Sequence, residues 1–164
     1  MRGEISTRLP PDRVADDDDG DDEEDSPGGS KFAPPPKPGE LIAATKAAEE
    51  DRVRELLELG ANVAETDGQL GRSALFWAAS IGSIHIIGLL YSAGADLEQS
   101  DKQGETPLVA AAMNGRSAVC YRLLQLGANP TAKTLAGETA LDHARRRGKA
   151  ECVAVLEAVT MAAQ

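Results

Sequence analysis

Few residues in this chain are of the types that carry out covalent or metal chemistry. The two histidines, His85 and His143, have no cysteine or acidic residue at the spacing of a zinc-ligand set. The two cysteines, Cys120 and Cys152, lie in apolar stretches at core-type positions, so we expect buried free thiols and no disulfide between them. These four residues therefore predict no metal, no cofactor and no nucleophilic site.

Two further patterns of catalytic chemistry are missing from the sequence. The chain contains neither the phosphate-binding G-x-x-x-x-G-K-S/T loop nor a G-x-G-x-x-G motif after a strand. Glu138 and Asp142 are four residues apart, but Glu138 precedes the expected helix and no partner surrounds the two acids. We therefore expect that the protein is not an enzyme, and that its function lies in a surface.

The glycines follow a regular period instead. The segments Gly71–Leu75, Gly104–Leu108 and Gly137–Leu141 share one pattern and are 33 residues apart. A second set of Gly-Ala steps runs at nearly the same period, namely Gly60–Asn62, Gly94–Asp96 and Gly127–Asn129. A period of this length indicates a stacked-repeat array, in which each repeat buries its apolar face against its neighbours.

Each copy contains the signals of two helices. Ser73, Thr106 and Thr139 precede an apolar segment and are good N-cap residues, and Pro107 stands at a first helical position, where its missing N–H costs nothing. A glycine then ends this helix, and apolar residues at helical spacing predict a second helix that runs up to the Gly-Ala step. The polar stretch before the next capping residue predicts a turn.

This order of turn, helix, turn and helix resembles the ankyrin repeat, and Asp101–Asn129 matches the pattern almost throughout. The resemblance implies an all-α fold, a solenoid of helix-turn-helix units joined by β-hairpin-like loops. The first copy lacks a capping Thr-Pro and the fourth ends before any Gly-Ala, as expected of terminal capping repeats. The expected repeats are approximately 40–66, 67–99, 100–132 and 133–162, with degenerate first and last copies.

One departure from the family pattern concerns contacts between repeats. The family usually has a histidine directly after Thr-Pro-Leu, where its ring binds the threonine and neighbouring repeats. Here Phe76, Val109 and Asp142 occupy that position. We expect that apolar packing holds the repeats together instead, in a less stable array of the same fold.

The first 39 residues differ in composition from the rest. Residues 16–25 contain nine carboxylates in ten positions, and Pro34–Pro38 favours a stiff polyproline linker. We expect residues 1–39 to be a disordered acidic and proline-rich tail, and residues 40–164 to be the repeat domain. The tail is interpreted either as solubilising or as an acidic arm that competes for a basic patch, on a partner or on Arg145–Arg147.

Charge and hydropathy limit the classes of partner and the cell compartments that we expect. The net charge of −10 repels phosphate backbones, so nucleic acid is not expected as a partner. The sequence shows no apolar run that predicts a signal peptide or a transmembrane span. With only two cysteines, both expected to be free, we expect an intracellular, reducing location, cytoplasmic and/or nuclear, and a monomer.

The resemblance also implies where partners bind, because ankyrin arrays usually bind them on the concave side, formed by hairpins and first helices. Mapped onto this sequence, the outward-facing positions include Ala110, and the expected partner-binding residues are Trp77, Ser80, Ile81, Met113, Asn114, His143, Arg146 and Arg147. Tryptophan and arginine are enriched at interface hot spots. The alternative for Trp77 is that it only packs against Phe76 and the neighbouring hairpin.

The run Arg145–Arg147 with Lys149 also has two interpretations. Cations at a helix C-terminus are stabilised by the helix dipole, which accounts for one or two of the four. The remaining basic residues favour an acidic peptide or an anionic headgroup as ligand.

Together these observations predict a non-catalytic protein–protein interaction module, an adaptor or a stoichiometric inhibitor, that binds its partner on the concave side. The alternative is a regulated targeting or scaffold module, in which the acidic tail carries the signal and the repeats dock an effector or an anionic membrane surface.

Overall fold

The computed structural model describes residues 33–162, and from Pro35 onward the chain forms one unit of stacked helix pairs. Most of the predicted acidic tail, residues 1–32, lies outside the described residues. The described part is all-α, with an isolated antiparallel bridge between Thr66 and Ser73. Its helices are α1 (Glu40–Lys46), α2 (Glu50–Glu58), α3 (Ala74–Ile81), α4 (Ile84–Ser92), α5 (Pro107–Met113), α6 (Ser117–Gln125), α7 (Ala140–Arg146) and α8 (Ala150–Ala162).

The predicted N-caps begin three of the first helices. The side-chain oxygens of Ser73, Thr106 and Thr139 each accept a hydrogen bond from the backbone N–H three residues later. Pro107 is the first residue of α5, as its capping threonine predicts. Gly82 ends α3 with a left-handed backbone, φ +98°. The helix pattern read from the sequence is therefore confirmed.

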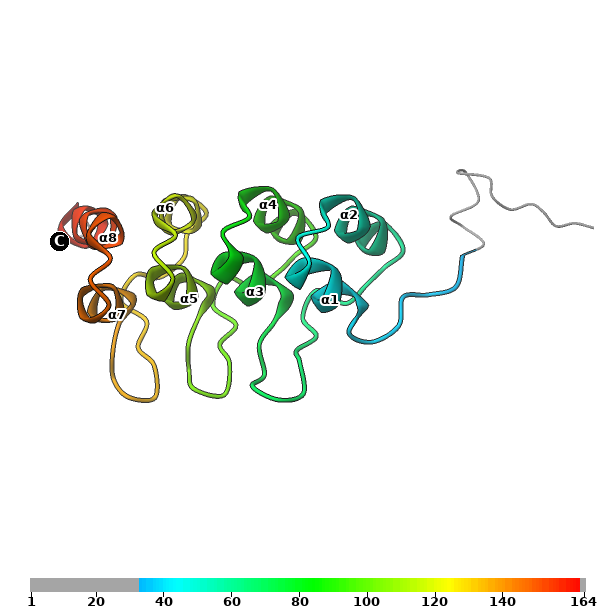
Figure 1. Ribbon diagram of the computed structural model, residues 1–164, viewed down its shortest axis with the longest axis horizontal. Helices are drawn as coiled ribbons and strands as arrows, with labels where there is room; N and C mark the ends of the chain where they lie inside the picture. The colour runs from blue at the N-terminus through cyan, green and yellow to red at the C-terminus, as the bar shows by residue number, and fades with distance from the viewer. Residues whose placement is uncertain (1–32, 163–164) are drawn as a thin grey trace, which may run out of the picture. The chain divides into compact units, whose positions relative to one another are not determined.

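The helices lie in two layers (Figure 1). The first helices α1, α3, α5 and α7 form one layer, the second helices α2, α4, α6 and α8 form the other, and the three hairpin loops extend from the first layer. Ala78, Ala79, Ala111 and Ala112 are fully buried, and their small side chains let neighbouring first helices approach closely. The predicted solenoid of helix pairs is confirmed.

The three residues in place of the family histidine behave differently from one another. Phe76 and Val109 are buried, 3% and 1% exposed, and join the apolar core. Asp142 is exposed and closes a capping box, since its Oδ2 accepts from the N–H and hydroxyl of Thr139 at 3.0 and 3.1 Å. The backbone N–H of Thr139 therefore lowers the pKa of Asp142.

The hairpins are linked to one another through the backbone. The N–H of Lys102 donates to the carbonyl of Leu70 at 2.9 Å, and the N–H of Leu135 donates to the carbonyl of Gln103 at 3.0 Å. Each of these bonds joins a hairpin to the hairpin of the preceding repeat. Backbone hydrogen bonds thus add to the apolar packing that the sequence predicts between repeats.

Both cysteines are fully buried and free, in α6 and α8. Burial raises the pKa of the Cys120 thiol, and the neighbouring Cys152 raises it further. Burial likewise raises the pKa of Cys152. The thiols are therefore protonated and inert at neutral pH, as expected of core residues.

None of the helices among residues 33–162 is long and apolar enough to cross a membrane.

Candidate protein-binding surface

Trp77 is held on the first-helix layer by contacts from two repeats. Its ring packs edge-to-face on Phe76, with centroids 6.2 Å apart, and the Lys46 ammonium lies 4.4 Å from its centroid. The indole N–H donates to Asp67 Oδ2 at 3.1 Å. These contacts agree with the interpretation of Trp77 as a packing residue, although part of the ring stays exposed.

Beside Trp77, Arg72 joins the second repeat to the third. Its Nε lies 3.1 Å from Asp101 Oδ2 and its Nη2 lies 3.6 Å from Glu105 Oε2. The Asp101 side chain is fully buried, and the guanidinium of Arg72 stacks 4.7 Å from the Phe76 ring centroid. Sequence analysis missed this ion pair. The signal was that Arg72 occupies the position at which the later repeats have Glu105 and Glu138.

The acids of this cluster have pKa values shifted in opposite directions. Burial raises the pKa of Glu105, the Asp101 carboxylate raises it further, and Arg72 opposes both. For Asp67, burial favours a higher pKa, but the hydrogen bonds from the N–H groups of Arg72 and Leu70 prevail and lower it. Asp67 is therefore a firmly charged acceptor for Trp77.

The middle of the surface is neutral and continuous from α3 to α5. The amide nitrogen of Asn114 donates to the Ser80 hydroxyl at 3.1 Å and to the carbonyl of Ala110 at 2.8 Å. Ile81 and Met113, the chain neighbours of Ser80 and Asn114, are half-buried. The structure thus brings two predicted partner-binding residues, Ser80 and Asn114, together across two repeats.

His143 was expected to face outward and is instead buried, with 6% of its surface exposed. Arg146 Nη2 lies 3.1 Å from its Nδ1, and Glu138 Oε1 lies 3.2 Å from its Nε2. The second approach is off the direction of a hydrogen bond, so Nε2 is buried without a hydrogen-bond partner among residues 33–162. Burial lowers the pKa of His143 and keeps the ring neutral.

Ala110 was also expected to face outward and is fully buried. It occupies the same position in its repeat as Trp77 and His143 do in theirs. A methyl group at this position does not reach past its neighbours, and Arg146 and Glu138 cover the His143 ring. Of the three, only Trp77 is partly exposed.

The basic run on α7 is largely neutralised by acids of this chain. Arg145 pairs with Glu157 at 2.8 Å, and Arg146 pairs with Glu138. Arg147 is exposed and forms no ion pair with another residue of the described range. The competitors for the first two arginines are therefore Glu157 and Glu138, which the sequence did not show.

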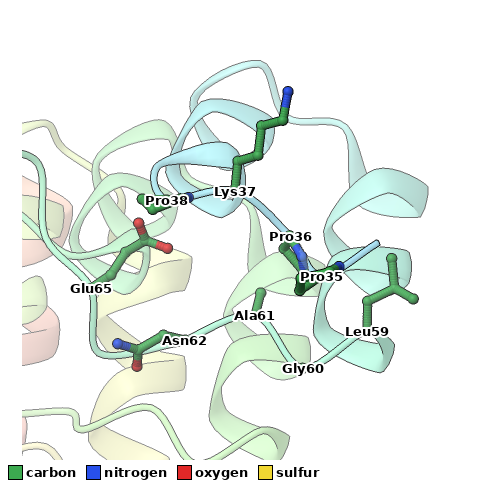
Figure 2. A pocket seen from close by; sticks show the side chains of 9 residues that line it. All are labelled: Pro35, Pro36, Lys37, Pro38, Leu59, Gly60, Ala61, Asn62 and Glu65. Atoms are coloured by element: carbon green, nitrogen blue, oxygen red, sulfur yellow. The ribbon is translucent and has the colours of Figure 1, made fainter. Parts of the chain in front are cut away.

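Several open hollows mark the described surface. One, of about 290 Å³, lies between Pro35–Pro38 and the segment Leu59–Asn62, with Lys37 pointing away from it (Figure 2). The N–H of Gly39 donates to the Glu65 carboxylate at its edge, which fixes the proline segment on the first repeat. No three histidine, cysteine or acidic residues within 33–162 are grouped to hold a metal ion.

Comparison with known proteins agrees with this architecture. The family model for ankyrin repeats in three copies matches residues 41–134. The chain is 31% identical over 121 residues to the E3 ubiquitin-protein ligase Ufd4 of Drosophila melanogaster, and 36% over 119 residues to the probable E3 ubiquitin-protein ligase XBOS33 of Oryza sativa. It is 38% identical over 108 residues to ankyrin repeat domain-containing protein 63 of Homo sapiens.

These alignments cover 72%, 71% and 63% of this chain, but only 4%, 23% and 28% of the respective relatives. The likeness to the two ligases is therefore confined to a part of each.

Proposed function

The chain belongs to the ankyrin-repeat family, whose repeats are protein–protein interaction modules, and we propose that it is a non-catalytic adaptor or stoichiometric inhibitor that binds its partner on the concave side. The observation that carries this proposal is the continuous row of side chains across α3 and α5. Ser80 and Asn114 are hydrogen-bonded to each other, and Ile81 and Met113 lie beside them, so the surface is preorganised.

The chemistry of the surface suggests the partner. Its middle is neutral and partly apolar, with Met113 and Ile81 half-exposed, which suits an apolar side chain of the partner. At its C-terminal end Arg147 is the arginine of the run 145–147 that carries no ion pair within residues 33–162. We therefore propose a partner with an apolar group over α5 and one acidic group beside Arg147, bound by a monomer.

The relatives named as ubiquitin ligases do not change this proposal. Ankyrin repeats are generally non-catalytic, and the alignment to the rice ligase covers 23% of that protein. What this chain has in common with it is confined to the 119 aligned residues. The absence of an enzyme activity is part of our proposal, and an intracellular location is supported by the two buried free thiols.

The alternative role of the tail, in which the acidic run Asp16–Asp25 carries the signal, concerns residues outside 33–162. No structural observation favours it.

The experiment is quantitative affinity capture from a cell extract with three forms of the full chain. The first is the native sequence, the second carries Met113→Glu and Arg147→Glu, and the third carries Tyr91→Ser and Tyr121→Ser. Tyr91 and Tyr121 are 41% and 55% exposed on the second helices and serve as the matched control.

We expect a partner that the native and control forms capture and that the Met113→Glu, Arg147→Glu form loses. Its binding should weaken modestly with salt, as for a single exposed ionic contact. A partner that is retained by this double variant and lost by the tyrosine variant would refute the proposed face.

A further inference from the structure

The second and third hairpins each lie directly on a glycine of the preceding one. A Cβ atom on Gly71 would meet Lys102 Cγ at 3.2 Å, and a Cβ on Gly104 would meet the backbone nitrogen of Leu135 at 2.8 Å. The same neighbours donate the hydrogen bonds to the carbonyls of Leu70 and Gln103, the residues just before these glycines. A carbonyl followed by a bare glycine is thus the binding element that one hairpin offers to the next.

The third hairpin repeats this element, and none of residues 33–162 lies on it. Gly137 has nearly the same φ as Gly104, +80° against +79°, but a Cβ on it would meet no atom of residues 33–162 within 4 Å. The carbonyl of Ala136 stands where those of Leu70 and Gln103 stand, and it accepts no backbone hydrogen bond from residues 33–162. Leu135, next to it, is 78% exposed.

The helices beside this hairpin do not offer the matching face for another helix pair. Asp142 is exposed where Val109 is 1% exposed in the preceding repeat. Arg145 is exposed where Ala112 is fully buried. A further repeat stacked in the same way would have to bury both charges, which is unfavourable. An extended segment without helices makes the hairpin contact and avoids this cost.

A second copy of this chain cannot place its own first hairpin, residues 66–73, on the third hairpin. Helices α1 and α2 precede that hairpin in the stack, so they would overlap the fourth repeat of the other copy. The occupant that the repeating contact specifies is therefore a single strand-like segment.

We propose that the third hairpin, Thr134–Glu138, binds an extended segment of a protein partner. A backbone N–H of the segment donates to the Ala136 carbonyl, its backbone lies on Gly137, and an apolar side chain covers Leu135. This mode resembles the addition of a strand to an exposed edge. It continues the contact already made twice within the array, and it goes beyond the proposed function because it uses no side chain of the first helices.

The probe is a synthetic peptide with the sequence of residues 130–138, which makes these contacts on Gly104 within the array. It is titrated into the isotope-labelled full chain, and amide chemical shifts are followed by NMR. We expect shift changes centred on Leu135, Ala136 and Gly137. Methylating the peptide nitrogen that corresponds to Leu135 N removes its donor, and should weaken binding about two- to tenfold.

Two variants of the protein complete the test. Gly137→Asn keeps a residue that tolerates positive φ, fills the space above the glycine, and should abolish the shifts. The Met113→Glu, Arg147→Glu form should bind the peptide unchanged, so that failure here is distinguishable from failure of the concave-side proposal. The inference is overturned if no shifts occur at the third hairpin, or if N-methylation leaves the affinity unchanged. The second criterion holds even if Gly137→Asn disturbs the hairpin.

Discussion

At the scale of single residues, Arg72 has the most consequential contacts. Its guanidinium neutralises the buried Asp101 of the next repeat, approaches Glu105, and stacks on Phe76. Removing Arg72 leaves the buried Asp101 carboxylate without its cation. This loss destabilises the fold by far more than the intact ion pair stabilises it. One side chain thus connects the polar hairpins to the apolar core of the stack.

We expect Arg72→Ala to lower the free energy of unfolding by about 1–3 kcal/mol, and Arg72→Lys to restore only part of it because lysine lacks the planar fork. Urea unfolding followed by circular dichroism measures both. The control is Arg54→Ala, which removes an exposed pair with Asp51 and should change stability by less than about 1 kcal/mol. Equal effects of Arg72→Ala and Arg54→Ala would contradict the role given to Arg72.

The burial of Glu105 predicts how the stability of the fold depends on pH. Its folded pKa is raised by burial and by Asp101, so the charged form is less favourable in the fold than in the unfolded chain. The stability it contributes is therefore present below the unfolded value of 4.5 and is lost as pH rises through the folded value.

Glu105→Gln should accordingly be more stable than the native protein at pH 7, and the gain should disappear below pH 4.5. Thermal unfolding from pH 4 to 7 compares the two proteins. A glutamine variant that is less stable at pH 7 would show that the pair with Arg72 outweighs burial.

The burial of His143 predicts the opposite dependence of stability on pH. Because burial lowers its folded pKa, stability is present above the unfolded value of 6.5 and is lost as pH falls through the folded value. His143→Gln should remove this loss, so that the stabilities of the variant and the native protein converge as the pH falls. Direct titration of the ring by NMR supplies the folded pKa, and a value above 6.5 would disagree with the buried neutral ring.

At the scale of elements, the hairpins stack through backbone contacts as well as side chains. Gly104 and Gly137 have nearly the same φ, but only Gly104 lies under the next hairpin. Substituting each of these two glycines therefore distinguishes the cost of strain in a left-handed backbone from the cost of disturbing the close approach of two hairpins.

We expect Gly137→Ala to cost about 1–2 kcal/mol, the strain of an L-residue at positive φ. Gly104→Ala carries the same strain and also pushes Leu135 N away from 2.8 Å, so its cost should be larger. Urea unfolding of the matched pair measures the difference. Equal costs would mean that the hairpins move apart freely and do not hold the repeats together.

The elements are also where sequence reasoning succeeded. Capping residues such as Thr106, and the 33-residue period, predict helices because both act locally and repeat in each copy. The pairing of Arg146 with Glu138, and of Arg145 with Glu157, was not predictable in the same way. These partners meet only after α7 has packed against its hairpin and α8, and nothing in the spacing marks them.

At the scale of the whole molecule, the unit from Pro35 onward is a row of helix pairs whose first helices carry different side chains along the stack. Lys46 and Trp77 lie toward the first repeat, Arg147 lies on the fourth, and the neutral contact between Ser80 and Asn114 lies between them. A partner that spans the first helices therefore meets an ordered sequence of chemistries, which gives specificity without a deep pocket.

We propose that this row, and not the second-helix layer, binds the partner. The most direct measurement is amide hydrogen exchange of the full chain with and without a captured partner. We expect added protection in α3, α5 and the hairpins that precede them, with α4 and α6 unchanged. Protection confined to α4, α6 and α8 would contradict it.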